Sequence, residues 1–312
     1  MQEKIVFLDA LTLGKNDLKN RIENLGIPYV EFPYTKQDEV IERAREASIV
    51  LTNKVMLNKE ILEKLKNSLK LICITATGMN NVDLKAADEL GILVKNVAGY
   101  STQSVAQHTL MMALALSAKL PFYDNFCKSG AYEKSHIFTE LTQPLHLISG
   151  KKWGIIGLGS IGKCVANLAT AFGAEVSYHS TSGKNLAAQY PHKDLESLLK
   201  DSDIISIHAP LNPQTQNLLN AKNLRFLKDG AILINVGRGG IVNEADLSEV
   251  LQKREIYAGF DVFTQEPVVK NPLFNPSFKD KVILTPHHAW GYEESKVILI
   301  DGILKNIKDF LA

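Results

Sequence analysis

Three glycines with the spacing G-x-G-x-x-G, at Gly157, Gly159 and Gly162, are the first residues whose spacing suggests chemistry. An apolar run that begins at Trp153 precedes them and a helical pattern, Lys163–Phe172, follows, which predicts a strand, a tight turn and a helix. In such a unit the glycines permit the turn, let the backbone approach a pyrophosphate, and let the helix pack on the strand. Free N–H groups at the helix start would hold the phosphates. The stretch predicts a dinucleotide-binding turn, although many such patterns are ordinary turns.

An arginine among glycines is the second candidate. The segment Asn235–Gly240 follows a predicted strand, so Arg238 is expected at the carboxyl edge of the sheet, where open α/β sheets bind ligands. Its guanidinium offers a planar fork for a carboxylate. A surface salt bridge is the alternative interpretation of this arginine.

Two later strand ends carry acids and histidines. Asp261–Pro267 follows one predicted strand and supplies Asp261 and Glu266, whereas Thr285–Trp290 follows the last strand and supplies His287. A histidine can give and take protons near neutral pH, and a neighbouring carboxylate favours its protonated form. A single histidine is more often structural. Three strand-end motifs beside a dinucleotide loop favour catalysis.

Length and composition limit the classes of protein to consider. The chain has 312 residues, which predicts two domains, and its 45% hydrophobic and 22% charged residues are typical of a globular protein. Lys+Arg 35 against Asp+Glu 34 leaves a net charge of +1, which argues against nucleic acid or an anionic membrane as a partner. Residues 1–10 resemble a first strand rather than a signal peptide, and no apolar run is long enough to span a membrane.

The cysteines are few and widely spaced. Cys73, Cys127 and Cys164 are odd in number and form no C-x-x-C pair, which argues against a metal site or a disulfide framework. This usage fits a reducing compartment, and we expect a cytoplasmic protein.

The elements that must position these residues alternate along the chain. In the first third, strands are predicted at Ile5–Leu8, Tyr29–Phe32, Ile49–Thr52, Leu71–Thr75 and Ile92–Val94, with helices near Asn16–Leu25, Gln37–Ala47, Asn58–Leu65 and Val82–Leu90. After the glycine turn, strands are predicted at Val176–His179, Ile204–His208, Ala231–Asn235, Ile256–Asp261 and Val282–Thr285. Such alternation predicts the α/β class with two doubly wound parallel-sheet domains.

Three further segments set the domain organisation. Ser101–Lys119 is a long apolar helix suited to bracing two domains, and Phe126–Ser149 is an irregular excursion suited to an oligomer contact. The final helix, Glu293–Leu311, is expected to return to the first domain and make it discontinuous. We therefore predict one domain from residues 1–98 plus 291–312, a second from 99–290, and a hinge at each crossing.

Taken together, the motifs make the chain resemble the D-isomer-specific 2-hydroxyacid dehydrogenases over essentially its full length. The segments that carry the resemblance are Ala76–Asp83, Ser104–His108, Gly154–Gly162, His208–Leu211, Asn235–Gly240, Asp261–Pro267 and Thr285–Trp290. The resemblance implies a flavodoxin-like substrate domain, a Rossmann dinucleotide-binding domain and a homodimer. Gln107 and Trp290 resemble the glycerate dehydrogenase (hydroxypyruvate reductase) branch in particular.

The resemblance also implies the roles of individual residues. The catalytic set falls on Arg238, Glu266 and His287, and the carboxylate-binding loop on Thr77 and Gly78. It further implies cofactor contacts by Thr109, Gly157, Gly159, Ser160, Ile161, Gly162, Ser180, Thr181, His208, Ala209, Pro210, Thr215, Val236, Gly237 and Asp261, the last facing the nicotinamide.

These roles make physical sense for a small 2-keto acid, with hydroxypyruvate or glyoxylate the expected substrate. Backbone N–H groups at Thr77 and Gly78 would hold its carboxylate, and Arg238 would bridge carboxylate and carbonyl oxygen. His287 would donate a proton to the developing alkoxide, and Glu266 would keep it protonated and oriented; such catalysis contributes roughly 10²–10⁴-fold. Closure of two hinged domains would exclude water. His288 is the alternative to His287.

The predicted second strand of the dinucleotide domain departs from the usual pattern. NAD-binding folds usually carry an acid about 20 residues past the glycines, where it binds the ribose 2′-OH. Here Ser180 stands at that position, with Thr181, Ser182 and Lys184 after it and no arginine. The cofactor is NAD or NADP, and the missing acid favours NADP.

Other activities of the same fold are possible. D-3-phosphoglycerate dehydrogenase is less favoured because the chain ends at Ala312, without room for the extra regulatory domain that many of those enzymes carry. Formate dehydrogenases are less favoured because Glu266 occupies the position where they differ. A sensor that binds the dinucleotide without turnover, like the family's transcriptional corepressors, is the candidate from another class.

Overall fold

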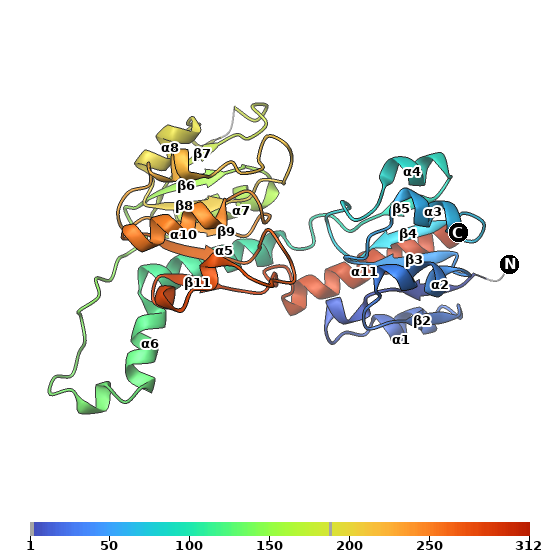
Figure 1. The fold of residues 1–312 in the computed structure, drawn as a ribbon, viewed down its shortest axis with the longest axis horizontal. Helices are drawn as coiled ribbons and strands as arrows, with labels where there is room; N and C mark the ends of the chain where they lie inside the picture. The colour runs from blue at the N-terminus through green and yellow to red at the C-terminus, as the bar shows by residue number, and fades with distance from the viewer. Residues whose placement is uncertain (1–2, 187–188) are drawn as a thin grey trace. The chain divides into compact units, whose positions relative to one another are not determined.

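The computed structural model describes residues 3–186 and 189–312, and the chain divides into two compact units. Unit 1 comprises the residues up to Ser101 together with Gly291–Ala312, and unit 2 comprises Thr102–Trp290 (Figure 1). The first boundary falls at 101/102, three residues beyond the predicted 98/99. No helix of the described residues is long and apolar enough to cross a membrane.

Unit 1 is built on a parallel five-stranded sheet in the order β2-β1-β3-β4-β5. Its strands are β1 (Ile5–Phe7), β2 (Tyr29–Glu31), β3 (Ile49–Thr52), β4 (Leu71–Ile74) and β5 (Leu93–Lys95). Its helices are α1 (Leu18–Glu23), α2 (Val40–Ala44), α3 (Lys59–Leu65), α4 (Leu84–Glu89) and α11 (Glu293–Leu311), with 3-10 turns η1 (Ala10–Leu13) and η2 (Gln37–Glu39). This strand order is the flavodoxin-like one.

Helices cover both faces of this sheet. The buried residues of α2, α3 and α4 form one core with alternate strand residues such as Val50 and Ile72. On the other side, α11 packs against β4 and α1, and Arg21 of α1 pairs with Asp301 of α11 at 2.7 Å. Gly302 allows this helix to approach the chain after β5, because a Cβ there would lie 2.6 Å from a Val97 methyl. The last helix therefore belongs to unit 1.

Unit 2 is built on a parallel six-stranded sheet in the order β11-β10-β9-β8-β6-β7. Its strands are β6 (Lys152–Ile156), β7 (Glu175–His179), β8 (Ile204–Ile207), β9 (Ile232–Asn235), β10 (Tyr257–Phe260) and β11 (Val282–Leu284). Its helices are α5 (Thr102–Ser117), α6 (Leu120–Lys128), α7 (Ser160–Ala171), α8 (Leu195–Asp201), α9 (Ala221–Leu224) and α10 (Glu244–Lys253), with 3-10 turns η3 (Tyr132–Lys134), η4 (Pro272–Phe274) and η5 (Pro276–Phe278). The predicted pair of doubly wound parallel sheets is confirmed.

Two separate apolar cores sandwich this sheet. Helices α5 and α7 cover one face, around the fully buried Trp153. Helices α8, α9 and α10 cover the other, against residues such as Ile205 and Leu233. The indole Nε1 of Trp153 donates to Ser206 Oγ at 2.9 Å, which satisfies the buried N–H between neighbouring strands. The sheet is a rigid base for the loops at its carboxyl edge.

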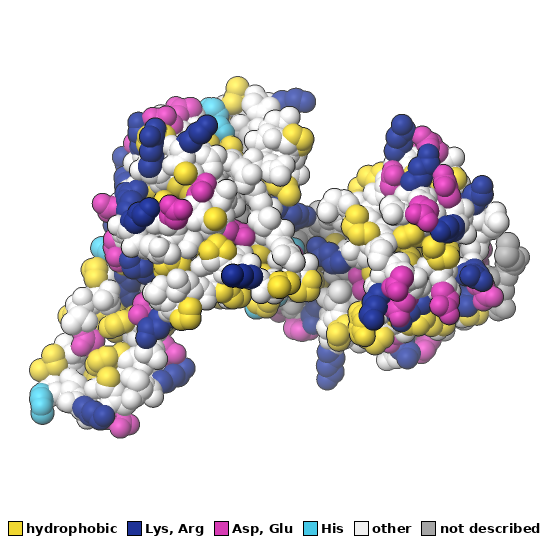
Figure 2. All heavy atoms as spheres, viewed as in Figure 1, with side chains coloured by type: hydrophobic (Ala, Val, Ile, Leu, Met, Phe, Trp, Pro, Cys, Tyr) yellow, Lys and Arg dark blue, Asp and Glu magenta, His cyan; other side chains and the backbone are white. Residues whose placement is uncertain are grey.

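The chain between α5 and β6 differs from the irregular segment predicted for Phe126–Ser149. Helix α6 continues to Lys128, because Pro121 is tolerated in its first turn and its apolar residues recur at helical spacing. Residues 120–147, which we call the arm, begin with α6 and expose many large apolar side chains, with Phe138 90% exposed. The others are Leu120, Tyr132, Ile137, Leu141, Leu145 and Leu147. Figure 2 shows hydrophobic side chains gathered along the arm, which extends away from the rest of unit 2.

Candidate active site

The glycine turn of unit 2 has the geometry that its spacing predicts. Gly157 has φ +92°, which favours glycine, and a Cβ there would lie 2.9 Å from the backbone N of Ala209. A Cβ on Gly162 would lie 2.2 Å from the carbonyl oxygen of Gly157, so the helix can pack closely only with glycine. At Gly159 a Cβ would meet no described protein atom within 4 Å. No protein contact requires a glycine there, which fits the close approach of a ligand.

The turn lies at the point where the strand order reverses. Strand β6 lies between β7 and β8, so the loops after β6 and β8 leave the sheet in different directions and open a crevice. Helix α7 begins in this crevice at Ser160, followed by Ile161, and its N-cap residue Gly159 supplies no side-chain hydrogen bond. The first N–H groups of α7 are therefore available to phosphate oxygens.

In unit 1 the strand order reverses between β1 and β3, but here a side chain of the protein binds the backbone N–H groups at the reversal point. Asp9 follows β1 and is buried, and its carboxylate accepts hydrogen bonds from Asn53 N (2.9 Å) and Lys54 N (2.7 Å) after β3. Burial raises the pKa of Asp9, partly offset by these bonds. The Asp9 carboxylate thus occupies the backbone N–H groups that a bound anion would use in such a fold. In unit 2 the corresponding N–H groups, at the start of α7, are available to a ligand.

The loop after β7 contains the residues expected beside the ribose. Ser180 is buried, Thr181 is half-buried, and Ser182 and Lys184 are exposed. The loop is tied to the glycine turn, because Asn185 Nδ2 donates to the carbonyl of Leu158 at 3.0 Å. Residues 187–188 lie outside the described structure.

The loop after β8 contains an unsatisfied nitrogen. His208 Nε2 lies 3.0 Å from Ser206 Oγ, whereas its buried Nδ1 has no hydrogen-bond partner among the described residues. Burial lowers the pKa of His208 to about 3, so the ring is neutral at physiological pH. Ala209 and Pro210 follow it, and Ala209 lies against the glycine turn.

Two threonines expected at the cofactor are engaged within the protein. Thr109 is fully buried in α5 and its hydroxyl donates to Val105 O at 2.8 Å. Thr215 is also fully buried, and its hydroxyl donates to Pro210 O at 2.6 Å, which closes the turn after β8. Both hydroxyls therefore donate to backbone carbonyl groups of the protein.

Arg238 lies on the loop after β9. Asn235 fixes this loop from within: its side chain accepts from Gly237 N at 3.1 Å and donates to Arg238 O at 3.0 Å. Val236 is buried, and the guanidinium of Arg238 is half-buried with Nη1 2.8 Å from Gly237 O. Among the described residues the guanidinium makes no other hydrogen bond, so its remaining donors are available to a carboxylate.

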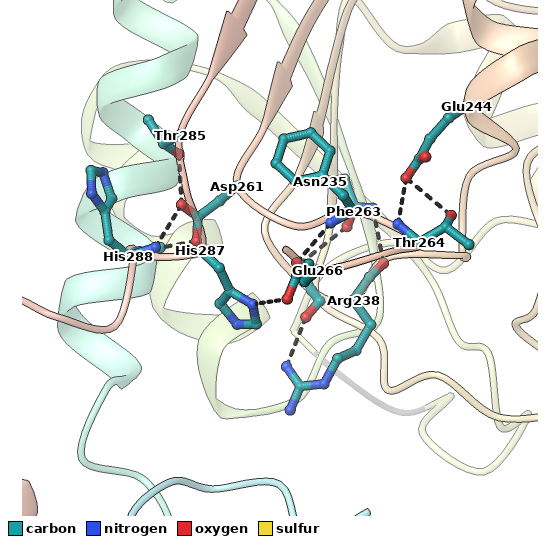
Figure 3. A network of polar contacts seen from close by, with 12 residues as sticks. Asn235, Arg238, Glu244, Asp261, Phe263, Thr264, Glu266, Thr285, His287 and His288 are labelled. Atoms are coloured by element: carbon teal, nitrogen blue, oxygen red, sulfur yellow. Dashed lines mark hydrogen bonds and ion pairs between the residues drawn. The ribbon is translucent and has the colours of Figure 1, made fainter. Parts of the chain in front are cut away.

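The loops after β9 and β10 touch each other closely. A Cβ at Gly239 would lie 1.9 Å from the carbonyl oxygen of Phe263, so only glycine allows this approach. The contact brings the loop of Arg238 beside the loop that contains Glu266 (Figure 3).

Glu266 and His287 form the most direct pair in the site. Glu266 Oε2 lies 2.6 Å from His287 Nδ1, and its Oε1 accepts from Phe263 N at 2.8 Å. With Nδ1 engaged, the other ring nitrogen of His287, Nε2, is left for proton transfer. Figure 3 shows the ring of His287 turned toward Glu266, while that of His288 turns the opposite way.

The backbone of His287 adopts an uncommon conformation. Its φ is +53°, in the left-handed region, which residues other than glycine rarely occupy. Such a conformation costs on the order of 1–3 kcal/mol and persists only where the surroundings impose it.

Asp261 is the residue that anchors this turn. It is 1% exposed, and its carboxylate accepts from His288 N at 3.0 Å, Ala289 N at 2.9 Å and Thr285 Oγ1 at 2.6 Å. It thereby holds both sides of His287. The sequence suggested that Asp261 faces a nicotinamide, and in the structure these three donors are its hydrogen-bond partners.

His108 and Thr285 extend this network and were not among the predicted site residues. His108 Nε2 lies 3.1 Å from Thr285 Oγ1, and the single proton of that hydroxyl goes to Asp261, so Nε2 must be the donor. Burial lowers the pKa of His108, against the opposite effect of Asp261. The position of His108 next to Gln107 in a matching segment was the only sequence signal for it.

One group of described residues has the composition of a metal site. Ligand atoms of His108, Asp261 and His288 all lie within 4.8 Å of one another. However, the oxygens of Asp261 already accept three hydrogen bonds, and His108 Nε2 carries the proton that it donates, so it offers no lone pair to a metal. The group forms a hydrogen-bonded support for the His287 turn.

Glu244 was also missed, because it lies at the start of α10, outside both predicted motifs and 20 residues before Thr264, which it binds. Its carboxylate accepts from Thr264 N at 2.8 Å and from Asn271 Nδ2 at 2.6 Å. It thus fixes the loop that contains Glu266.

In unit 1, Thr77 and Gly78 follow β4 at the carboxyl edge of its sheet. Asn96 holds this loop by donating to Thr77 O at 2.6 Å, and the Thr77 hydroxyl donates to Val97 O at 3.2 Å. Within the described residues, the backbone N–H groups of Thr77 and Gly78 donate no hydrogen bond. They remain available to an anionic ligand.

The comparison with known proteins identifies the family. Residues 110–289 match the "D-isomer specific 2-hydroxyacid dehydrogenase, NAD binding domain". The glycerate dehydrogenase of Methylorubrum extorquens is 37% identical over 314 aligned positions, which cover 100% of this chain and 97% of that protein. The chain belongs to the D-isomer-specific 2-hydroxyacid dehydrogenase family. It is therefore an oxidoreductase with an NAD-binding domain, as the motifs predicted.

Solved structures of 2-hydroxyacid dehydrogenase relatives have the same two-domain α/β fold. An acyclic imino acid reductase in complex with NADPH and D-Arg is 31% identical, with a TM-score of 0.84 and coverage of 99% of this chain and 97% of that one. An NADPH-dependent glyoxylate/hydroxypyruvate reductase from Sinorhizobium meliloti, in complex with NADP and malonate, is 26% identical with a TM-score of 0.85, covering 100% and 94%. The reactions named for these relatives differ, so fold alone does not define the substrate.

Proposed function

We propose that this 2-hydroxyacid dehydrogenase reduces a small 2-keto acid, hydroxypyruvate or glyoxylate, to the D-2-hydroxy acid. The observation that carries the proposal is the His287–Glu266 pair beside the loop of Arg238, an acid–base pair next to a carboxylate-binding fork. The names of the relatives support the substrate class, since they include glycerate dehydrogenase and glyoxylate/hydroxypyruvate reductase.

In this proposal Arg238 and His287 act on the reacting carbonyl. The guanidinium of Arg238 binds the substrate carboxylate and the carbonyl oxygen, where negative charge develops. His287 donates the proton on its Nε2 to that oxygen during reduction and removes it during oxidation. Glu266 holds the ring through Nδ1 and stabilises its positive charge. The N–H groups of Thr77 and Gly78 bind the substrate carboxylate.

The cofactor residues belong to unit 2, which we propose as the dinucleotide-binding domain, with unit 1 as the substrate domain. Gly157, Gly159 and Gly162 let the pyrophosphate lie against the N-terminus of α7. When bound, the nicotinamide supplies or accepts the hydride. The open space at Gly159 and the unpaired Nδ1 of His208 both fit a bound dinucleotide.

We further propose that NADP(H) is preferred over NAD(H). The position that usually carries an acid is Ser180, and residues 180–186 contain no carboxylate. A 2′-phosphate is therefore not repelled, and the hydroxyls of this loop together with Lys184 can bind it. The two solved relatives described above were both determined with NADPH or NADP.

A panel assay tests the proposed reaction. Hydroxypyruvate, glyoxylate, pyruvate and phosphohydroxypyruvate are each assayed with NADH and NADPH by absorbance at the nicotinamide band. We expect the highest kcat/KM with hydroxypyruvate or glyoxylate and NADPH. A clear preference for phosphohydroxypyruvate would assign D-3-phosphoglycerate dehydrogenase instead, and a KM ratio that strongly favours NADH would refute the cofactor preference. Absence of turnover with every keto acid, with cofactor binding intact, would favour a sensor.

We also propose a homodimer formed through the arm. Leu141, Leu147 and Phe138 are among its exposed apolar residues, and exposed apolar side chains gathered in this way mark protein interfaces. Light scattering after size exclusion should give twice the monomer mass, and Phe138→Asp should shift the protein toward monomer. A monomeric wild type would contradict this.

We propose a cytoplasmic location, since the cysteines described are free thiols, as in a reducing compartment. Fractionation of cells that contain the tagged protein tests this, and recovery from an oxidising compartment would contradict it.

A further inference from the structure

A small cavity lies at the amino edge of the unit 2 sheet, opposite the glycine turn. It has a volume of about 130 Å³ and is lined by Lys119, His146 and Lys151 together with Asp203, Asp229 and the first residues of β8 and β9. We call it the amino-edge pocket. One water needs only about 10–15 Å³ of such space, so the pocket accommodates a group of several heavy atoms.

The pocket is separate from the cofactor site. Strand β6 runs from Lys152 beside the pocket to Ile156 beside the glycine turn, five residues in all. At roughly 3.3 Å per residue this is about 16 Å. A ligand at one edge of the sheet therefore does not contact the other edge.

The acids around the pocket are already paired with bases that do not line it. Asp203 pairs with Lys228 at 2.9 Å and also accepts from Lys152 N at 2.8 Å. Asp229 pairs with Arg254 at 2.8 Å. Lys119 and Lys151 have no ion-pair partner among the described residues, so the pocket carries an excess of positive charge.

Lys119 is the central residue of this charge excess. It is only 4% exposed, its φ is +51°, and its Nζ lies 3.1 Å from the centroid of the Tyr257 ring. In the described part of the protein its ammonium makes no hydrogen bond, although an ammonium has three donors. The adjacent Glu255 and Lys281 pair with each other at 2.8 Å. A buried ammonium that rests on an aromatic face thus has unused donors toward the pocket.

The electrostatics agree with this geometry. Burial lowers the pKa of Lys119 to about 8, with Glu255 acting in the opposite direction and Lys281 in the same one. Burial also lowers the pKa of His146, and both Lys151 and Lys119 lower it further, so the three basic groups that line the pocket lie near one another. An anion among them would offset this mutual repulsion.

From this arrangement we propose that the amino-edge pocket binds a small oxyanion of the size of phosphate or sulfate. Lys119 and Lys151 contribute charge-assisted hydrogen bonds, which are roughly twice as strong as neutral ones. The pocket is then a second, non-catalytic anion site on the dinucleotide-binding unit. The proposal does not depend on the substrate or on the cofactor preference.

Thermal unfolding with inorganic phosphate tests the proposal. The protein is saturated with NADPH, so that phosphate cannot occupy the pyrophosphate position, and chloride keeps the ionic strength constant. A ligand that binds the folded state raises Tm, by about 3 °C at about ten times its Kd for a unit of this size. We expect a saturable rise with phosphate and with sulfate.

Variants distinguish this pocket from general salt effects. Lys119→Met and Lys151→Met should each weaken phosphate binding at least tenfold, as measured by calorimetric titration. Lys152→Met, which removes an exposed lysine beside the pocket but outside its lining, should leave the affinity unchanged. If Lys119→Met fails to fold, Lys151→Met still decides the outcome. Equal Tm shifts in all variants would overturn the proposal.

Glycerol 3-phosphate provides a further comparison, because a phosphoryl group can also come from a metabolite. Binding no tighter than phosphate, and lost in Lys151→Met, assigns the pocket to the free ion. Tighter binding that is lost in the same variant assigns it to a phosphorylated metabolite. Binding of either compound that persists in Lys151→Met would contradict the assignment.

Discussion

His287 Nδ1 lies 2.6 Å from Glu266 Oε2, and the second oxygen of that carboxylate is held by the N–H of Phe263 at 2.8 Å. The Glu266 carboxylate is thus held by its own loop through one oxygen and contacts His287 with the other. Since the carboxylate accepts from Nδ1, the imidazole has one defined orientation, and its Nε2 makes no hydrogen bond to any described residue. A fixed ring is what proton transfer to a bound substrate requires.

Replacement of Glu266 by glutamine should impair proton transfer without disturbing the fold. The amide oxygen can still accept from Phe263 N, but the amide NH₂ would meet the Nδ1–H of His287, donor against donor. We expect kcat to fall by roughly 10²-fold or more. Steady-state kinetics give this value, and fluorescence titration of NADPH should give an unchanged Kd. Glu249→Gln, on the exposed side of α10, is the matched control.

A loss confined to KM in Glu266→Gln would contradict this account, because it would mean that the carboxylate binds substrate rather than orients His287.

Ser180→Asp should change the cofactor preference. An aspartate at the end of β7 would repel a 2′-phosphate and could accept a hydrogen bond from the 2′-OH of NAD. We expect KM for NADPH to rise at least tenfold and KM for NADH to fall or stay constant. Ser182→Asp, on the exposed part of the same loop, is a comparison for general charge effects. If Ser180→Asp leaves the NADPH:NADH ratio unaltered, this loop does not select the cofactor.

The half-buried His208, whose Nδ1 is fully buried, should make the protein less stable in acid. The pKa of His208 is lowered by burial to about 3, whereas in the unfolded chain it is close to the ordinary 6.5. Between these values the unfolded state binds more protons, so the free energy of unfolding is retained above pH 6.5 and decreases as pH falls toward 3. The slope is about 1.4 kcal/mol per pH unit for one such group, or about 2 kcal/mol between pH 6.5 and 5.

Denaturant unfolding at these two pH values measures the effect. His208→Gln preserves a donor toward Ser206 but does not titrate, so its stability should depend less on pH than that of the wild type. Exposed His136 provides the control, because His136→Gln should leave the pH dependence as it is. An identical slope in His208→Gln and wild type would contradict the assigned burial effect.

The Thr285 hydroxyl should matter for stability because it connects two buried groups. Thr285→Val would remove the hydroxyl that accepts from His108 Nε2 and would deprive Asp261 of its shortest hydrogen bond, at 2.6 Å. We expect the free energy of unfolding to fall by about 1–3 kcal/mol. Thr109→Val is the matched control, because the Thr109 hydroxyl donates only to a carbonyl within its own helix. Equal effects of the two substitutions would contradict a special role for the network.

The two sheets could be predicted because each strand is a short apolar run between helical patterns. Parallel strands are buried on both faces, so β3 and β8 contain almost only apolar residues, and the reversal points follow from the fold class. The end of α6 was predicted less accurately than the strands, because the polar and apolar residues after Lys119 are compatible with either a helix or an irregular segment.

For the site, the sequence indicated which strand ends carry chemical groups but not how these groups pair. His287 and His288 are adjacent and chemically identical, and only the left-handed φ of His287 turns one ring toward Glu266. The role of Asp261 in fixing that turn, through two N–H groups after His287, depends on backbone geometry that no residue pattern encodes. His108 was missed because its only sequence signal was its position next to Gln107 in a matching segment.

The most direct test of the account is single-turnover hydride transfer in His287→Gln and His288→Gln, with NADPH and hydroxypyruvate both saturating. We predict that His287→Gln slows the reaction by roughly 10²–10⁴-fold while NADPH still binds with wild-type affinity, and that His288→Gln stays within about threefold of wild type. The opposite pattern, with His288→Gln inactive and His287→Gln active, would contradict the assignment of His287 as the proton donor.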